Sequence, residues 1–307
     1  MATRNTYEDW IPEEYSGPVI TRVNQQSAVE RLARRIPMAT DTKHVPRSAG
    51  VGVNFVAKGN PYTEDASVND DVLLTALKFG RVIRIADEDL KDTTQVANII
   101  ATKQNDWATS YAKFIDNATL ATSAAGNGTT VPFTSLYYSL TQNDTDTSYT
   151  ANANLTQTGS GGVTYDNLSA TLADYEAGDF FDDGNTIVIA SPVFKAAFRG
   201  IKDDEGRPIF VTGLAGTPDT LFNYPVAWSN GCRLSATATD TPTGSPVLFV
   251  GNREYLFLGI RSGPESMTAG ADTGAAFLTD EALLKMRARR GFAVAHEKAW
   301  ACLEDNS

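Results

Sequence analysis

The amino-acid sequence predicts a mixed α+β fold without a repeating β-α-β pattern. Three observations lead to this expectation: a long arm of alternating apolar residues, one long stretch with helical spacing, and a later succession of short helices and apolar strands. The chain has 307 residues, of which 42% are apolar and 21% charged, ordinary values for a chain that buries a core. Its length is typical of about two domains.

The arm spans residues 45–86 and has the pattern of a hairpin with a polar tip. In its outgoing leg, Val51, Val53 and Phe55 occupy alternate positions. The return leg is expected to place these side chains on one strand face: Leu73, Thr75, Leu77, Phe79, Arg81, Ile83 and Ile85. Legs of about 12–15 residues would reach roughly 40–50 Å, whereas a compact chain of this length has a radius of gyration of about 20 Å. We therefore expect the arm to find much of its partner surface on another molecule.

The N-terminal segment, residues 1–26, is polar but carries several aromatic residues, including Trp10 and Tyr15. Such a segment either docks on another molecule or packs on its own domain, and the sequence leaves both alternatives open. Ser27 and Glu30 then form an S-x-x-E capping box, which predicts a helix that Pro37 ends.

The longest helical pattern covers residues 95–119, where apolar side chains recur at a spacing of 3.6 residues. A helix of this length would be nearly 40 Å long and would form a structural spine. Residues 126–162 are instead rich in Gly, Ser, Thr and Asn. Their composition predicts a loop or hairpin insertion that faces outward.

Shorter elements follow in a mixed order. Residues 164–178 predict a helix, and residues 185–191 predict a buried strand. Ser191 is expected to cap the next short helix, with Pro192 at its first position and Gly200 after its end.

The last element predicts a long strand with two different faces. One face is apolar and consists of Leu284, Met286, Ala288, Phe292 and Val294. The other face carries the basic residues Lys285, Arg287 and Arg289.

Bulk properties exclude several classes of protein. The net charge of -11 and the sequence pI of about 4.7 argue against tight binding to a nucleic-acid backbone. No run of about 18 apolar residues is present for a membrane span, and the first residues lack the pattern of a signal peptide. The two cysteines, Cys232 and Cys302, lie far apart in the sequence and fit a reducing compartment.

Signals for catalysis are poor. His44 and His296 are the two histidines, and neither has the spacing of a metal motif. The sequence contains no nucleophile elbow and no phosphate-binding Walker loop. Asp144 and Asp146 resemble the start of a calcium loop, but the loop glycine is missing and Leu155 stands at the distal glutamate position. We expect no catalytic site, no metal site and no cofactor.

Six stretches in their order carry a resemblance to a known family. They are the arm and helix of residues 10–37, the hairpin of residues 45–92, the helix of residues 95–119, residues 191–228 with a helix, an acidic-Gly-Arg-Pro turn, a Gly-rich loop and a Pro-led strand, and the strands of residues 251–266 and 289–300. Together they resemble the major capsid proteins of tailed double-stranded-DNA bacteriophages, which have the Hong Kong 97-type fold. The resemblance covers nearly the whole chain.

The resemblance implies a division of the chain into named parts. These are an N-terminal arm (1–26), a first helix of the peripheral region (27–44), an extended E-loop hairpin (45–86), the spine helix of a peripheral domain (87–125), an axial domain (126–265) and the C-terminal strand of the peripheral domain (266–307). The E-loop would lie over a neighbouring subunit, and the axial domain would point to the centre of each capsomer.

The resemblance also implies a function. Copies of the chain would form hexamers and pentamers that close into an icosahedral head around double-stranded DNA. The protein would be located in the virion after assembly in the bacterial cytoplasm. Expected partners are a portal, a separate scaffold protein, a decoration protein and packaged DNA in non-specific contact, with no membrane. The alternative is an encapsulin-type shell that encloses protein cargo.

Candidate intersubunit contacts follow from the charges. The hairpin tip is expected to carry Glu64, Asp65, Asp70 and Asp71, whereas the last strand exposes Lys285, Arg287 and Arg289. Opposite charges on two elements of a repeated subunit can set the register of assembly. The sequence leaves open that the two faces are unrelated and solvated. Trp10 and Tyr15 of the arm are further contact candidates.

Some members of the family form an isopeptide bond between a lysine of the E-loop and an asparagine near the C-terminal strand. Lys58 is the candidate donor near the tip. The matching stretch, residues 277–286, contains no asparagine. We therefore do not expect a crosslink.

Overall fold

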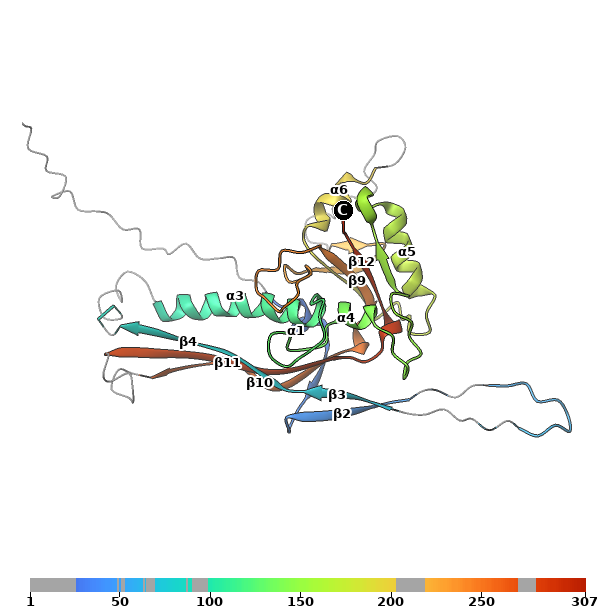
Figure 1. Ribbon diagram of the computed structural model, residues 1–307, viewed down its shortest axis with the longest axis horizontal. Coiled ribbons are helices and arrows are strands. Elements are labelled where there is room, and N and C mark those ends of the chain that lie inside the picture. Colours follow the sequence, from blue (N-terminus) through green and yellow to red (C-terminus); the bar gives the residue numbers. More distant parts are fainter. Residues whose placement is uncertain are drawn as a thin grey trace, which may run out of the picture.

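The computed structural model describes residues 26–48, 50, 53–62, 64, 70–86, 88–89, 99–202, 219–269 and 280–307. Within these ranges the fold is mixed α+β, as predicted, and it is elongated (Figure 1). Three sheets organise the strands: a long four-stranded ladder, a six-stranded sheet and a two-stranded sheet.

The four-stranded ladder forms the long axis of the molecule. Its strands, in spatial order, are β1 (Arg34–Pro37), β10 (Leu256–Ala269), β11 (Glu281–Val294) and β4 (Leu77–Ala86). β11 is antiparallel to both of its neighbours, and β1 is parallel to β10. Helix α3 (Ile99–Leu120) lies along one face of this ladder (Figure 1).

The alternation of β11 explains how the helix and the ladder fit together. Leu284, Met286 and Ala288 are buried, and Ala288 packs in a cluster with Tyr111 and Ile115 of α3. The sequence predictions of the spine helix and of a two-faced last strand are confirmed within the described residues. Residues 95–98, which the prediction included in the helix, lie outside them.

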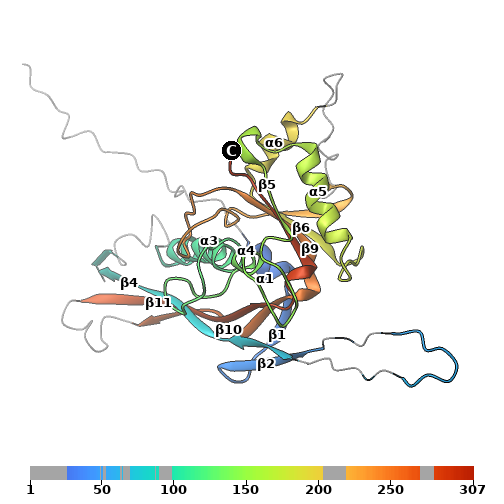
Figure 2. The ribbon, with the colours of Figure 1, turned by 45° about the vertical axis from the view of Figure 1, so that its right-hand side comes forward.

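The six-stranded sheet is built from segments that are distant in the chain. In spatial order its strands are β5 (Leu155–Gln157), β12 (Trp300–Glu304), β9 (Val247–Asn252), β6 (Thr186–Ala190), β8 (Tyr224–Trp228) and β7 (Thr220–Leu221). Helices α5 (Tyr165–Glu176) and α6 (Phe194–Gly200) lie at this end of the molecule, away from the outer part of the ladder (Figure 2). β6 is buried at every position, as predicted.

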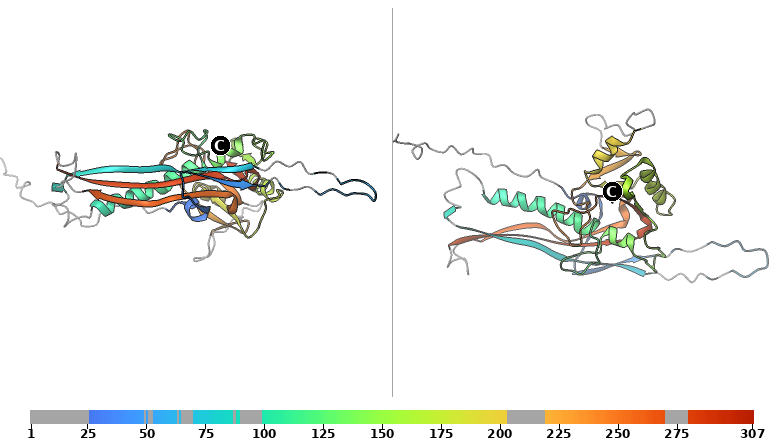
Figure 3. Two further views of the ribbon diagram at one scale, coloured as in Figure 1. Left: turned by 90° about the horizontal axis from the view of Figure 1, so that it is seen from below. Right: turned by 45° about the horizontal axis from the view of Figure 1, so that its top comes forward.

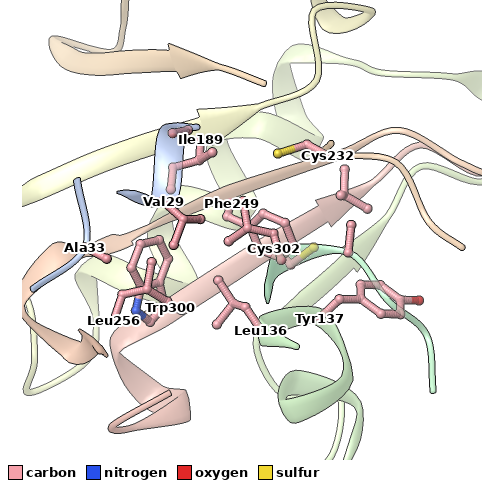
Figure 4. Close-up of a cluster of buried hydrophobic side chains, with 14 of the residues drawn as sticks. Val29, Ala33, Leu136, Tyr137, Ile189, Cys232, Phe249, Leu256, Trp300 and Cys302 are labelled. Atoms are coloured by element: carbon pink, nitrogen blue, oxygen red, sulfur yellow. The ribbon is translucent and has the colours of Figure 1, made fainter. Parts of the chain in front are cut away.

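One apolar core joins the two large sheets. The cluster draws on α1 (Ala28–Leu32), on α4 (Leu136–Thr141) and on strands of both sheets. Figure 4 shows Leu256 of the ladder next to Trp300 of the six-stranded sheet, with Val29 and Leu136 around them. The two large sheets therefore share this core, and a second buried cluster lies between the six-stranded sheet and helices α5 and α6.

The division into domains needs one correction. The sequence analysis placed residues 266–307 in a single peripheral unit, but β12 is the second strand of the six-stranded sheet. The chain leaves the ladder after Val294, passes through a 3₁₀ turn at Glu297–Ala299 and enters the other sheet. Every residue from 300 to 304 is buried. The outer part of the ladder has one uncovered face and could not bury both sides of this strand.

The first helix is shorter than predicted. Ser27 caps it, because the Glu30 backbone N–H donates to Ser27 Oγ at 3.0 Å, but α1 ends at Leu32 instead of before Pro37. Ala33 is extended, and the following residues form β1 against β10. Pairing with a distant strand thus overrides the local helical pattern.

The predicted hairpin is divided in two at Ala76. β2 (Thr42–Arg47) pairs with β3 (Asp70–Thr75), whereas β4 pairs with β11 of the ladder. The single apolar face predicted from Leu73 to Ile85 is therefore wrong: Val72 and Leu74 are buried in β3, and Leu73 is 50% exposed. The Ala76 N–H donates to Asp41 O at 2.7 Å, and the side of the chain that is buried changes after this residue.

Residues 126–162 are not an outward-facing insertion. Their apolar side chains enter the core, among them Val131, Phe133, Leu136, Leu140 and Tyr149. α4 begins with a Ser135 cap, and β5 pairs in parallel with β12. The composition of this segment is mostly polar, so it did not indicate that these apolar side chains are buried in the core.

The short helix after β6 also differs from the prediction. Val193 is the residue before the helix and Gly200 is its last residue, so Gly200 does not follow its end. The Ser191 hydroxyl makes no capping bond: Ser191 Oγ is buried without a hydrogen-bond partner.

Candidate intermolecular interface

The hairpin beyond β2 and β3 exposes large apolar side chains. Val53 is 97% exposed, Phe55 is 95% exposed and Tyr62 is 87% exposed. These residues lie on the segment that projects past the end of the ladder in Figure 1. Because exposed apolar surface of this kind marks an interaction site, the hairpin is the first candidate surface for contact with another molecule.

Arg47 holds the base of the hairpin. Its Nε donates to Asp70 Oδ1 at 2.8 Å, its Nη2 also pairs with Asp70, and its Nη1 donates to Ala295 O at 2.9 Å. The hydrogen bond from Arg47 lowers the pKa of Asp70 below its usual value. This two-pronged contact ties the hairpin base to the turn that follows β11.

The tip acids of the sequence analysis are therefore of two kinds. Asp70 belongs to the base and is already paired with Arg47, and Asp71 contacts His44 Nδ1 across the same two strands. Glu64 is exposed farther out, and Asp65 lies outside the described residues. The prediction that all four acids sit at the tip is wrong for Asp70 and Asp71, because β3 begins at Asp70.

The basic side chains of β11 lie on the face of the ladder that α3 leaves uncovered. Arg287 and Arg289 already hold acids of their own chain: Arg287 Nη2 is 3.0 Å from Glu265 Oε2, and Arg289 Nη2 is 2.9 Å from Asp41 Oδ1. Lys285 has no ion-pair partner within the described ranges. The view from below in Figure 3 shows the ladder strands in front of α3.

The structure adds β4 residues to this face, which the sequence analysis missed. Lys78 pairs in register with Arg289, and Val82 pairs with Lys285. Paired residues of neighbouring strands point to the same side of a sheet. The face, hereafter the bare ladder face, thus carries Lys78 and the 53% exposed Val82 beside the basic residues of β11. The alternation of side chains along β4 can be read from the sequence, but the register of β4 with β11 cannot.

Arg290 interrupts the apolar face of β11 and is only 5% exposed. Its Nε donates to Glu30 Oε1 at 2.7 Å, and the Tyr111 hydroxyl donates to the same oxygen at 2.9 Å. Burial raises the pKa of Tyr111, so its hydroxyl stays protonated as a donor. The contact joins α1, α3 and β11 and has a structural role.

Asp116 of α3 forms a second buried junction. Its carboxylate accepts hydrogen bonds from the Ser27 hydroxyl, from the Ala28 N–H at 2.9 Å, from the Val29 N–H at 3.2 Å and from the Ser229 hydroxyl. Burial raises the pKa of Asp116, and the four donors oppose that shift. One side chain thus satisfies the first N–H groups of α1 and binds it to the spine helix.

His296 and Glu297 lie beside the hairpin base. Burial and the nearby Arg47 lower the pKa of His296 to about 4, so the imidazole is neutral at pH 7. Its ring centroid is 4.0 Å from that of Phe180, and its Nδ1 accepts from the Lys298 N–H at 3.2 Å. Burial raises the pKa of Glu297, whose Oε2 accepts a hydrogen bond from Thr147.

The described residues include no group of three or more His, Cys, Asp or Glu side chains arranged to hold a metal ion. No helix among them is both long and apolar enough to cross a membrane. Cys232 and Cys302 are free thiols with no exposure, and burial raises the pKa of both. Lys58 is exposed near the tip, whereas Trp10 and Tyr15 lie outside the described residues.

The described chain is thus an elongated subunit with exposed apolar side chains on a projecting hairpin and with one ladder face that α3 does not cover. A family model described as the phage capsid family matches residues 8–305. The chain therefore belongs to the phage capsid family and is a structural component of a virion capsid. No curated protein sequence matches it.

Solved structures show the same Hong Kong 97-like fold. A chain of Mycobacterium phage Bobi is 17% identical, with a TM-score of 0.74 over 98% of this chain and 97% of that one. A chain of Mycobacterium phage Ogopogo is 14% identical, with a TM-score of 0.74 over 99% of this chain and 100% of that one. A chain of the capsid of the native GTA particle is 15% identical, with a TM-score of 0.73 over 100% of both chains. The encapsulin alternative is not favoured.

Proposed function

We propose that the protein is the major head protein of a tailed bacteriophage and that its copies form hexamers and pentamers of an icosahedral shell around double-stranded DNA. The observation that carries this proposal is the hairpin, whose Val53, Phe55 and Tyr62 are at least 87% exposed in the single chain. A repeated subunit can cover these side chains on the next copy and close the assembly by symmetry.

Electron microscopy of the purified full-length protein tests the proposal. Closed shells of uniform diameter are the expected product, with or without a co-expressed scaffold protein. Tubes, open sheets or a stable monomer under all conditions would contradict it. Nucleic-acid absorbance of shells from infected cells separates a DNA-filled head from a shell with protein cargo.

We propose that the hairpin of one copy lies on the bare ladder face of its neighbour. The exposed Glu64 of the tip, with Asp65, would then face Lys285 and Lys78, which have no ion-pair partner within the described part of the chain. Arg287 and Arg289 also lie in this proposed contact, hereafter the seam, but they already pair with Glu265 and Asp41 of their own chain. Each exposed pair contributes only about 0–1 kcal/mol, and many copies per shell multiply the effect.

Charge reversal tests the seam. Lys285→Glu should slow or prevent shell formation, and Glu64→Lys with Asp65→Lys should restore it in the same chain. The double change Arg287→Glu and Arg289→Glu should act in the same direction but also disturbs contacts within the chain. Normal shells from Lys285→Glu, confirmed as folded by circular dichroism, would overturn the seam.

The remaining expectations are proposals of the same kind. A portal, a scaffold protein and a decoration protein would be the other partners, assembly would take place in the bacterial cytoplasm, and contact with DNA would be weak and sensitive to salt. No turnover of a substrate is expected. Lys58 would stay free, so a ladder of bands above 33.0 kDa on denaturing electrophoresis of shells would contradict that expectation.

A further inference from the structure

A groove of about 600 Å³ opens between α3 and the edge strand β4. It lies on the α3 side of the ladder, opposite the bare ladder face. Lys103 and Trp107 of α3 line one wall, and Phe79, Arg81 and Ile83 of β4 line the other. Figure 1 shows the helix and the strand running beside each other along this length.

The floor of the groove is aromatic. Phe79 and Phe114 are in contact with ring centroids 5.8 Å apart, and Trp107 stacks on Tyr111 at 5.1 Å. Phe79, Trp107 and Phe114 are only partly buried, so the groove presents ring surface that no described residue covers. A partner with aromatic side chains would fit this floor.

The rim of the groove carries two free cations. Arg81 pairs in register with the buried Met286, so it points to the α3 side, and yet it is exposed. Lys103 is exposed on the helix, and neither cation has a hydrogen bond or ion pair in the described ranges. Lys78 also borders the groove, although its register places it on the bare ladder face, and Asp106 and Asp240 are the acids in the lining, so cations outnumber acids there.

The chain itself contains a segment of matching chemistry. Residues 7–15, with the sequence YEDWIPEEY, hold three aromatic and four acidic side chains and no basic one. The described chain begins at Gln26, which lines a smaller cavity together with Trp107 and Tyr111, two residues that also line the groove. An extended chain from Tyr15 to Gln26 spans up to roughly 35 Å, enough to pass around the helix.

We propose that residues 7–15 dock in the groove between α3 and β4, with Trp10 on the aromatic floor and the segment's carboxylates at Arg81 and Lys103. The docking site rests on the proposed function, because it gives the N-terminal arm a defined receptor on a capsid subunit. The segment comes from the same chain, because Gln26 shares a cavity with Trp107 and Tyr111 of the groove and the intervening residues are long enough to reach it.

Disulfide trapping in the full-length protein tests the docking. Cys232 and Cys302 have no exposure, so introduced surface thiols are the ones that oxidise. Lys103→Cys is combined in turn with Glu8→Cys, Glu13→Cys and Glu14→Cys, and the matched control places Lys285→Cys on the bare ladder face instead. At least one groove pair should oxidise about tenfold more than its control, because docking raises the effective thiol concentration.

The products identify the source of the segment. A faster-migrating monomer on non-reducing electrophoresis means docking within one chain and supports the proposal, whereas a band of twice 33.0 kDa alone means docking between copies and overturns it. No bond in any of the three groove pairs, or equal bonding in the control pairs, overturns it.

Two further measurements separate this proposal from the proposed function. Shells that form without any groove disulfide would overturn the docking alone, whereas a protein that never assembles under reducing conditions would contradict the proposed function. Arg81→Glu with Lys103→Glu should reduce trapping between Glu13→Cys and a reporter Ser110→Cys, and reversal of Glu8 and Glu14 to Lys should restore it. Both cations are exposed, so folding is not at risk.

Discussion

The shared core and the projecting hairpin both contain large apolar residues, but these side chains are buried in the core and exposed on the hairpin. Trp300, Phe249 and Leu136 are fully buried by their own chain, whereas Val53 and Phe55 are at least 95% exposed. Burial within the chain stabilises the fold of the single subunit. Exposure of the same residue types leaves apolar surface that the described part of the chain does not cover and that is available to another molecule. Substitutions should therefore separate folding from assembly.

The largest effect on folding is expected at Asp116. Asp116→Ala removes the acceptor of four donors in a fully buried position, including the Ala28 and Val29 N–H groups. Each buried donor without a partner costs about 1–3 kcal/mol, so the loss of unfolding free energy should be about 3–5 kcal/mol. Urea unfolding of the unassembled subunit measures it.

Asp116→Asn is the matched control, because it keeps the size of the side chain and one acceptor oxygen. Its loss should be smaller than that of Asp116→Ala. Equal stability of Asp116→Ala and the wild type would show that the junction does not hold α1 to α3.

The next effect is expected at Gly251, where β9 faces Trp300 in register. A Cβ atom there would lie 2.5 Å from Ala299 O and 2.5 Å from Trp300 Cδ2. Overpacking of this kind costs typically about 1–3 kcal/mol, so Gly251→Ala should lower the melting temperature clearly. Gly263→Ala, in open space on β10, is the control and should change stability by less than about 0.5 kcal/mol. A similar loss in both variants would contradict the close packing.

A smaller and pH-dependent effect is expected at His296. Its pKa is about 4 in the folded chain, mainly through burial, and lies near 6.5 when unfolded. The unfolded state therefore takes up the proton first as the pH falls. The contribution of His296 to the free energy of unfolding is therefore fully present above about pH 6.5. It is lost as the pH falls from 6.5 to 4 and does not change further below pH 4.

His296→Asn should remove this part of the acid sensitivity. Because the imidazole is partly exposed, the difference between the two proteins from pH 7 to 4 should be roughly 1–2 kcal/mol. Unfolding of both proteins at a series of pH values measures it, and the subtraction cancels the opposite contributions of Glu297 and Asp116, whose pKa values are raised. Parallel stability curves would contradict the prediction.

The smallest effect on folding is expected at the hairpin. Phe55→Ser should change the unfolding free energy of the free subunit by less than about 0.5 kcal/mol, because Phe55 has almost no intrachain contact to lose. The same change should reduce the yield of shells in electron micrographs. Normal assembly of Phe55→Ser would show that the exposed hairpin side chain is not needed between subunits. A large loss of subunit stability would show that Phe55 contributes to the fold of the single chain.

Some elements could be predicted because their signal lies within one stretch of chain. The helical spacing through Trp107, Tyr111 and Ile115 predicted α3, and the alternation through Leu284, Met286 and Ala288 predicted both faces of β11. Elements whose partners are distant were mispredicted. Residues 34–37 read as helix until β10 is placed beside them.

The candidate interface shows the same division. Lys285, Arg287 and Arg289 could be assigned to one face from the sequence, but their in-chain partners could not. Asp41 and Glu265 lie 248 and 22 residues away from the arginines they bind. The tip position predicted for Asp70 and Asp71 is wrong, because the pairing of β2 with β3 decides where the tip begins and composition alone does not show that pairing.

The sequence by itself determined the α+β class, the spine helix, the two-faced last strand and the presence of a hairpin in the first third of the chain. These features follow from side-chain periodicity, which each segment carries alone. Only the tertiary structure decided that the hairpin changes face at Ala76, that residues 126–162 enter the core and that β12 joins the second sheet. These outcomes depend on which distant surfaces bury the apolar side chains of a given strand, and no single segment carries that information.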